Sequence, residues 1–213
     1  MLENWTLIME TSVPQATLLL ARDAEVIARA EFTSERSQEV DFFGPLKEIL
    51  AALPTIKQLS AVVIGTGPGS YNGARVGIAA GQAIAQVHGC GVAGLCSFEG
   101  VSDLKWAVGD ARRGSFFIMK VGSEPKLVEH REFASRLAEC EGMKGTFEPV
   151  EKLKLDDESI EQVTPTAEGL LAAWLGRSEA EKEALMKIPA EAFYLRPPHI
   201  TVSKKKSLMD KTP

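Results

Sequence analysis

The segment that decides the fold is Ala61-Val-Val-Ile64, followed at once by Gly65-Thr-Gly-Pro-Gly-Ser-Tyr-Asn-Gly-Ala-Arg75. The first four residues are apolar and mostly β-branched, which predicts a central strand covered on both faces. The glycines that follow predict a tight turn, because glycine adopts positive φ without steric cost. From Tyr71 to His88 the apolar spacing is helical. A buried strand, a glycine-rich turn and a helix in this order indicate an α/β protein.

The flanking sequence predicts a mixed sheet with helices on its faces. Three short apolar runs near the start predict an antiparallel meander, and a three- and four-residue apolar spacing then predicts a helix in which Pro45 causes a kink or marks the first turn. The predicted strands are Thr6–Thr11, Ala16–Ala21, Val26–Phe32, Gly91–Leu95, Ser115–Val121 and Lys126–Arg131, and the further helices are Ser37–Leu53, Ser97–Val108 and Thr166–Leu175. We place a lobe boundary near Val108. This gives an N-terminal lobe over 1–108, a smaller C-terminal lobe over 109–203 and a flexible tail over 204–213.

Composition narrows the possible partners. The chain has 213 residues, 45% of them hydrophobic, and a net charge of -5. Such a charge offers little counterion release on RNA or DNA, so we expect weak direct binding of nucleic acid, even with the basic run Lys204–Lys206. No apolar run is long enough to span a membrane, and Glu3 with Asn4 does not fit a signal peptide. The expected location is the cytoplasm.

Several kinds of chemical site are disfavoured. The three cysteines lack C-x-x-C spacing and the three histidines are scattered, so neither a disulfide framework nor a metal site is predicted. The turn lacks the lysine of a Walker A loop, and Pro68 occupies the first glycine position of a nucleophile elbow around Ser70. We therefore predict no catalytic residue, and we expect Ser70 to cap the following helix.

Two loops are candidate anion sites. In the first, Gly67, Gly69, Ser70 and Gly73 would present backbone N–H groups beside a helix N-terminus, with Arg75 nearby. The alternative is a turn that serves packing only. In the second, Asp110-Ala-Arg-Arg-Gly114 offers the guanidinium groups of Arg112 and Arg113. Here the alternative is an Asp–Arg pair that fixes the turn.

A stripe of small residues in the helix Tyr71–His88 predicts close backbone approach. Glycine inside a helix costs roughly 0.5–1 kcal/mol relative to alanine, so its recurrence indicates a packing gain within the domain or across an interface. We assign the stripe to a partner interface, supported by Phe42 and Ile49 of the preceding helix. The stripe consists of Gly73, Gly77, Gly81 and Ala85.

Taken together, the motifs resemble a known family. In chain order they are Ile8-Met-Glu-Thr-Ser12, Phe42-Phe-Gly-Pro-Leu46, Gly67-Pro-Gly-Ser-Tyr-Asn-Gly73 with Arg75-Val-Gly-Ile78, Asp110-Ala-Arg-Arg-Gly114 and Phe193-Tyr-Leu-Arg-Pro197. This set is similar to that of the bacterial tRNA threonylcarbamoyladenosine biosynthesis proteins of the TsaB, or YeaZ, family. Glu10 stands where many of those proteins carry aspartate, and Glu35–Glu39 lacks a histidine common there.

The resemblance implies an actin/Hsp70-like (ribonuclease H-like) fold of two lobes, the C-terminal one reduced. It also implies a non-catalytic scaffold that pairs with the TsaD-like transferase, joined by the TsaE-like ATPase. That complex modifies the tRNA adenosine next to the anticodon. The chain would meet tRNA only through the complex and form a homodimer when isolated. It would hold no cofactor alone, with ATP or ADP possible only in the complex.

Two other function classes stay open. One is an enzyme of the same fold, either peptidase-like or a phosphotransferase. The other is a stand-alone nucleotide binder that uses the Gly67–Gly73 turn. The two enzymes need groups that the motifs do not supply. A peptidase needs an activated nucleophile or a metal-bound water, and a kinase needs carboxylates that hold Mg²⁺.

Overall fold

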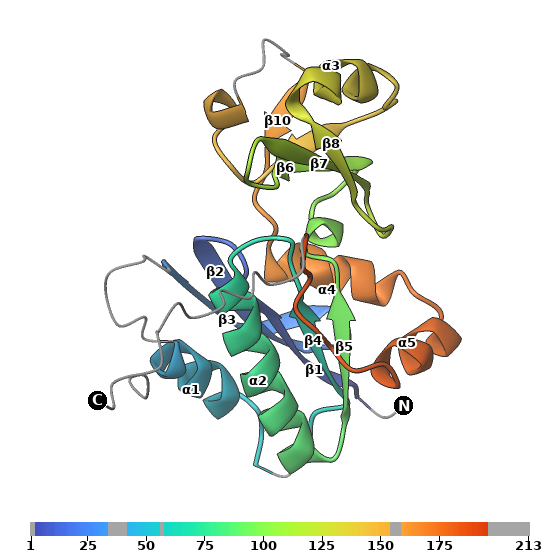
Figure 1. The fold of residues 1–213 in the computed structure, drawn as a ribbon. Coiled ribbons are helices and arrows are strands. Elements are labelled where there is room, and N and C mark those ends of the chain that lie inside the picture. The colour runs from blue at the N-terminus through green and yellow to red at the C-terminus, as the bar shows by residue number, and fades with distance from the viewer. Residues whose placement is uncertain (1–2, 34–41, 56–57, 154–158, 196–213) are drawn as a thin grey trace, which may run out of the picture.

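The computed structural model describes residues 3–33, 42–55, 58–153 and 159–195. Within them the chain forms two five-stranded mixed sheets, each with its own helices, and the sheets lie one above the other in Figure 1. This is the predicted two-lobed α/β architecture. The beginning of the predicted helix Ser37–Leu53 and the tail 204–213 lie outside the described residues.

The first sheet has the order β3-β2-β1-β4-β5. Its first three strands form the predicted antiparallel meander, and β4 and β5 continue the sheet in parallel with β1. Ile8 stands between Leu19 and Val63 in the register. The strands are β1 (Trp5–Glu10), β2 (Gln15–Arg22), β3 (Glu25–Thr33), β4 (Ala61–Gly65) and β5 (Gly91–Leu95).

Helices cover both faces of this sheet, which explains its continuous apolar strands. On one face Leu7, Met9 and Ile64 pack against α1 (Phe43–Ala51) and α2 (Tyr71–His88). The strand residues that alternate with these, such as Ile8 and Val63, point to the opposite face and pack against α4 (Ala167–Leu175). Helix α5 (Glu179–Met186) packs on the same face. Because strand side chains alternate with period two, one apolar strand supplies both cores. Pro45 lies in the first turn of α1, which was one of the two positions predicted for it, the other being a kink inside the helix.

The second sheet has the order β10-β9-β6-β7-β8. One face packs against α3 (His130–Ala138) through Phe133 and Leu137, beside the short helix η2 (Val150–Leu153). The other face packs against Phe98 of η1 (Ser97–Gly100). The strands are β6 (Trp106–Asp110), β7 (Ser115–Lys120), β8 (Lys126–Glu129), β9 (Lys144–Thr146) and β10 (Ile160–Gln162).

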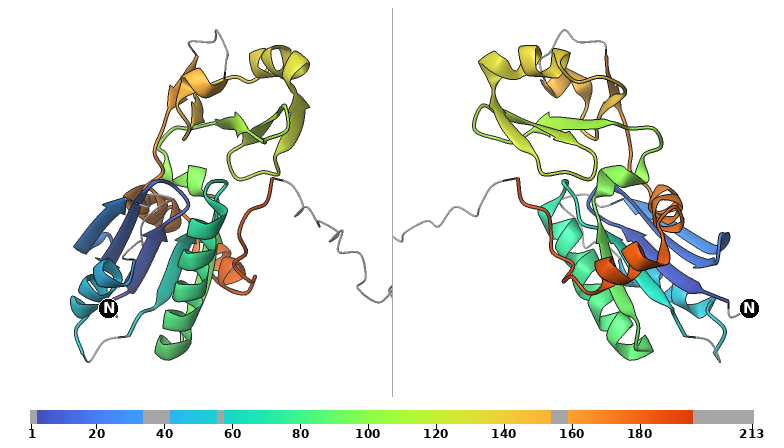
Figure 2. Two further views of the ribbon diagram at one scale, coloured as in Figure 1. Left: turned by 60° about the vertical axis from the view of Figure 1, so that its left-hand side comes forward. Right: turned by 90° about the vertical axis from the view of Figure 1, so that its right-hand side faces the viewer.

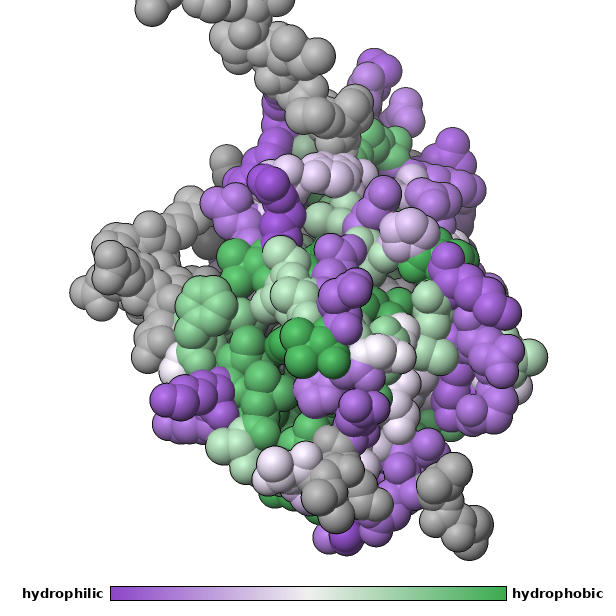
Figure 3. All heavy atoms as spheres, turned by 90° about the horizontal axis from the view of Figure 1, so that it is seen from below, coloured by the Kyte–Doolittle hydropathy of each residue, from purple (hydrophilic) through white to green (hydrophobic). Residues whose placement is uncertain are grey.

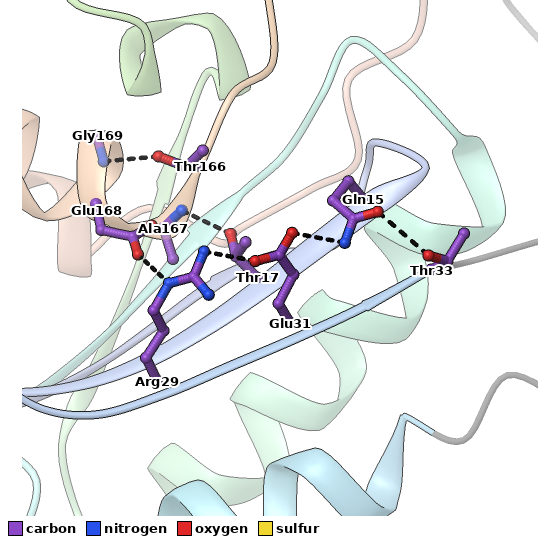
Figure 4. Close-up of polar contacts among 9 residues, drawn as sticks. All are labelled: Gln15, Thr17, Arg29, Glu31, Thr33, Thr166, Ala167, Glu168 and Gly169. Atoms are coloured by element: carbon purple, nitrogen blue, oxygen red, sulfur yellow. Dashed lines mark hydrogen bonds and ion pairs between the residues drawn. The ribbon is translucent and has the colours of Figure 1, made fainter.

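The chain crosses between the lobes twice, and the two crossings touch. It leaves after η1 and returns before α4 (Figure 2). A Cβ added at Gly100 would lie 2.9 Å from the Thr166 carbonyl oxygen, so the crossings meet backbone to backbone. The start of α4 is tied to the first sheet, where Ala167 N–H donates to Thr17 Oγ1 (2.8 Å) and Arg29 pairs with Glu168 (2.5 Å; Figure 4).

Three sequence predictions need correction. The predicted helix Ser97–Val108 is only the single turn η1, because residues from Trp106 onward pair with β7 instead. Gly109 suits that strand, since a Cβ there would lie 2.6 Å from the Phe117 ring. The boundary near Val108 therefore falls inside a strand. The 109–203 lobe is also too long, because α4 and α5 pack on the first sheet.

Among the described residues, none of the helices has both the length and the apolarity that crossing a bilayer requires.

Candidate functional site

The glycine-rich turn after β4 packs tightly against the end of β1. A Cβ at Gly69 would lie 2.9 Å from Ser12 Oγ and closer still to the Ser12 carbonyl oxygen. Gly67 has a φ of 97°, where other residues are strained. Both glycines are therefore required by the local geometry, and the turn is built around Ser12.

Three amides of this turn already have protein partners. Gly67 N–H donates to Ser97 Oγ (2.9 Å), Ser70 N–H to the Ser12 carbonyl (2.5 Å) and Gly73 N–H to Ser70 Oγ (3.3 Å). An anion would have to displace these bonds. These bonds favour the packing alternative at Gly67, Ser70 and Gly73, while the anion site that includes Gly69 stays a prediction. Ser70 is the helix N-cap, as predicted.

The second predicted anion loop is also held by its own contacts. Arg112 N–H donates to Asp110 Oδ1 (2.6 Å), and its guanidinium lies 3.4 Å from Asp110 Oδ2. Arg112 and Arg113 both have positive φ, at 64° and 56°, in the turn that joins β6 to β7. For Arg112 the alternative explanation is therefore correct, since this residue pairs with Asp110 and fixes the turn.

The small-residue stripe of α2 faces the sheet of its own lobe. A Cβ at Gly81 would lie 2.8 Å from Met9 Cε, and one at Gly77 would overlap the Thr11 hydroxyl. Ala85 is buried. Phe42 and Ile49 are only 3% and 2% exposed. The assignment of these residues to a partner interface was wrong, because the close approach that the stripe permits is internal. The same holds for Gly73, whose added Cβ would overlap the Thr11 carbonyl oxygen.

Helices α1 and α2 also carry exposed apolar side chains, outside the buried stripe. Val76 and Val87 of α2 are 44% and 80% exposed, and Phe43 of α1 is 72% exposed. We call these three residues the outer apolar face. Figure 3 shows apolar residues gathered among polar ones on the side of the molecule seen from below. In the 3.6-residue period Val76 and Val87 fall on the same side of α2, beside the glycine stripe, so the sequence could have shown that these two residues share one side of the helix.

A second exposed cluster joins the start of α2 to the end of the described chain. Tyr194 Oη donates to Tyr71 Oη (2.8 Å), and the ring centroids are 5.0 Å apart. The Arg75 guanidinium carbon lies 5.1 Å from the centroid of the Tyr71 ring. Phe193 N–H donates to the Thr66 carbonyl (2.8 Å) and so fixes this C-terminal segment to the turn. Sequence reasoning named Arg75 but missed both tyrosines.

The carboxyl group of Glu10 lies at the centre of a buried polar cluster. Its Oε1 accepts from Ser12 N–H and Ser12 Oγ, both at 2.7 Å, and Ser12 Oγ lies 2.9 Å from Ser97 Oγ. Its Oε2 is buried beside Gly65, and has no hydrogen-bond partner among the described residues. Burial raises the pKa of Glu10 above its ordinary value, although hydrogen bonds from Ser97 and Ser12 oppose the rise. The group is thus a buried structural acid.

Comparison with known proteins relates this arrangement to one fold. The family model for TsaD, described as tRNA N6-adenosine threonylcarbamoyltransferase, matches residues 46–117. The solved structure of YeaZ from Pseudomonas aeruginosa superposes with a TM-score of 0.66 at 15% identity, over 89% of this chain and 99% of that one. The chain has the YeaZ fold. A second P. aeruginosa structure, described as similar to the peptidase YeaZ, gives 0.65 at 19% identity over 91% and 100%.

Curated relatives match over a shorter stretch. Uncharacterised proteins of Mycobacterium tuberculosis and Mycobacterium bovis are 31% identical over 100 residues, which cover 45% of this chain and 46% of each relative. The chain thus spans about half the length of the curated relatives it matches. The YeaZ fold is an actin-like, ribonuclease H-like fold of two lobes, as predicted.

Within this YeaZ fold the cysteines are spread over both lobes. Cys90 and Cys96 are half-buried and Cys140 is buried, all as free thiols. Burial raises the pKa of Cys96 to about 11, so this thiol stays protonated near neutral pH. In the part of the chain that the structure describes, no three His, Cys, Asp or Glu side chains are grouped to hold a metal ion.

The raised pKa of Glu10 has a measurable consequence for the stability of this YeaZ-like chain. The folded state holds the proton more tightly than the unfolded state, so the stabilisation is fully present below the unfolded pKa of about 4.5 and is lost as pH rises through the folded pKa. Glu10→Gln does not lose stability in this way, because glutamine does not titrate. We expect the free energy of unfolding of Glu10→Gln, relative to wild type, to increase as the pH rises above 4.5, with a slope of at most about 1.4 kcal/mol per pH unit.

The measurement is urea unfolding at a series of pH values. Glu161→Gln, which alters an exposed carboxylate on β10, is the control and should give a difference that stays nearly constant with pH. A constant difference for Glu10→Gln as well would contradict the raised pKa of the buried Glu10 carboxyl.

Proposed function

We propose that the chain is a non-catalytic accessory subunit that pairs with a TsaD-like transferase in the threonylcarbamoyl modification of tRNA adenosine next to the anticodon. The observation that carries the proposal is the YeaZ fold together with the TsaD match over residues 46–117. Those residues include most of α1 and all of α2, and so Val76 and Val87 of the outer apolar face but not Phe43.

The geometry of the turn supports a role other than catalysis. The Ser70 hydroxyl caps α2, and the Glu10 carboxyl is fully buried in contact with Ser12. An activated nucleophile needs a neighbouring base, and phosphoryl transfer needs carboxylates that reach a metal and a substrate. Neither residue is placed to do this. We therefore propose that the chemistry belongs to the partner.

The outer apolar face supports a protein partner. Phe43, Val76 and Val87 are large apolar side chains that are 72%, 44% and 80% exposed. Exposed apolar patches of this kind mark protein interaction sites. We propose that this face binds the TsaD-like subunit and mediates homodimerisation when that subunit is absent. The TsaE-like ATPase and tRNA would join through the assembled complex, and ATP or ADP would bind only there.

Complex formation can be tested with purified components. The chain is mixed with the TsaD-like subunit of the same organism, and the molar mass is measured by size-exclusion chromatography with light scattering. We expect a heteromeric complex, and a dimer for the chain alone at micromolar concentration. A chain that stays separate from the subunit would contradict the proposal. Calorimetric titration of the isolated chain with ATP tests the alternative, since tight binding would favour a stand-alone nucleotide binder.

A further inference from the structure

The tyrosine pair at the start of α2 positions a guanidinium group beside a surface hollow. Arg75 stacks over Tyr71, and Tyr71 is in turn fixed by the hydroxyl–hydroxyl bond to Tyr194. The hollow has a volume of about 320 Å³ and is lined by Arg75, Ile78, Ala79, Gln82, Glu191, Ala192 and Tyr194. The stack restrains the guanidinium, which reduces the conformational entropy that binding would otherwise cost.

The charge of this guanidinium is not neutralised by an ion pair within the described residues. Those residues contain ion pairs for Arg22, Arg29 and Arg177, among others, but none for Arg75. Glu191 lines the same hollow without pairing with Arg75. Arginine has a planar fork of donors that matches a carboxylate or a phosphate. An anionic group is therefore the complement of this site.

The surroundings of Arg75 favour a protein as the source of that anion. Ala79, one turn after Arg75 on α2, is exposed and lines the hollow. The residue that directly follows Arg75 is the exposed Val76 of the outer apolar face. Tyr71 and Tyr194 are 45% and 49% exposed. Tyrosine and arginine beside apolar residues make up the usual composition of an interface hot spot.

We propose that Tyr71, Arg75 and Tyr194 form the polar anchor of the partner interface and bind an acidic side chain of the partner subunit. This inference rests on the proposed function. The anchor takes a carboxylate of Asp or Glu in bidentate contact with Arg75, while the outer apolar face packs beside it. Glu191 opposes the incoming carboxylate, so its removal strengthens the contact.

The test measures the dissociation constant between the chain and the purified TsaD-like subunit by biolayer interferometry. Arg75→Glu is expected to weaken binding about 30-fold or more, the size of a hot-spot loss. Arg75→Lys, which keeps the charge but not the fork, should weaken it about 5-fold. Tyr194→Phe should also weaken binding, and Glu191→Gln should strengthen it. Lys120→Glu makes the same charge reversal on an exposed residue of the second lobe and should change nothing.

A charge-swap scan then identifies the acidic group. Each surface Asp or Glu of the partner is changed to Lys, and one such change should restore binding to Arg75→Glu. If Arg75→Glu binds within about twofold of wild type while the wild-type complex forms, the anchor is wrong and the proposed function stands. If wild type does not bind the subunit, both are wrong. If the isolated chain binds ADP or inorganic phosphate and Arg75→Glu abolishes this, the hollow is a small-anion site and the inference is overturned.

Discussion

Gly77→Leu is expected to unfold the first lobe. A Cβ at this position already overlaps the hydroxyl of Thr11, which is buried and donates to the Gly73 carbonyl (2.8 Å). A leucine would have to separate α2 from β1. Leucine has higher helix propensity by about 0.8 kcal/mol, but overpacking of a filled core costs 1–3 kcal/mol or more. Because the conflict involves a hydrogen-bonded site, we expect a loss of about 3 kcal/mol or more.

The matched control is Ala83→Leu on the exposed arc of the same helix. It adds the same kind of side chain without meeting the sheet, so its unfolding midpoint should stay near that of wild type. Circular dichroism during urea unfolding reports both variants. If Gly77→Leu is as stable as wild type, the glycine stripe is not packed against the sheet as described.

Val76→Asp and Val87→Asp are expected to disrupt the complex with the TsaD-like subunit while leaving the monomer folded. Both side chains are substantially exposed, so a carboxylate there remains hydrated in the free chain. In the complex it would be buried against apolar surface without a partner, which is costly. We expect each variant to weaken binding about 30-fold or more. Isothermal titration calorimetry measures the effect.

Val26→Asp is the control for the outer apolar face. Val26 lies on β3 and is 44% exposed, the same exposure as Val76. The two variants therefore make the same chemical change on different surfaces. Only the one on α2 should weaken the complex. Equal binding by Val76→Asp, Val87→Asp and Val26→Asp would exclude the outer apolar face as the interface.

Local sequence patterns were sufficient to predict the strands of the first sheet and helix α2. The β-branched run that became β4, the glycines after it and the helical period of α2 each have one favourable local structure. The second lobe was harder to predict, because short strands such as β9 and β10 carry too few residues to show a period. The return of α4 to the first sheet depends on contacts between distant residues, such as Ala167 N–H with Thr17. No local pattern contains that information.

The candidate site was predicted in part. Spacing identified the glycine stripe of α2 as a close-contact surface, but spacing alone does not say whether the contact lies inside the lobe or outside it. The Thr11 side chain next to Gly77 decides this, and its position depends on the fold. Similarly, Tyr71 and Tyr194 are 123 residues apart, so only the folded chain brings them together.

The most direct test of the accessory-subunit role is reconstitution of tRNA modification from purified components. The TsaD-like and TsaE-like proteins of the same organism, the threonylcarbamoyl-adenylate donor, ATP and unmodified tRNA are incubated with and without this chain. Threonylcarbamoyladenosine is then measured by mass spectrometry of the digested tRNA. We predict that the product accumulates over repeated turnovers only when the chain is present, and that the chain alone forms none. Full activity without the chain, or product formed by the chain alone, would contradict the proposal.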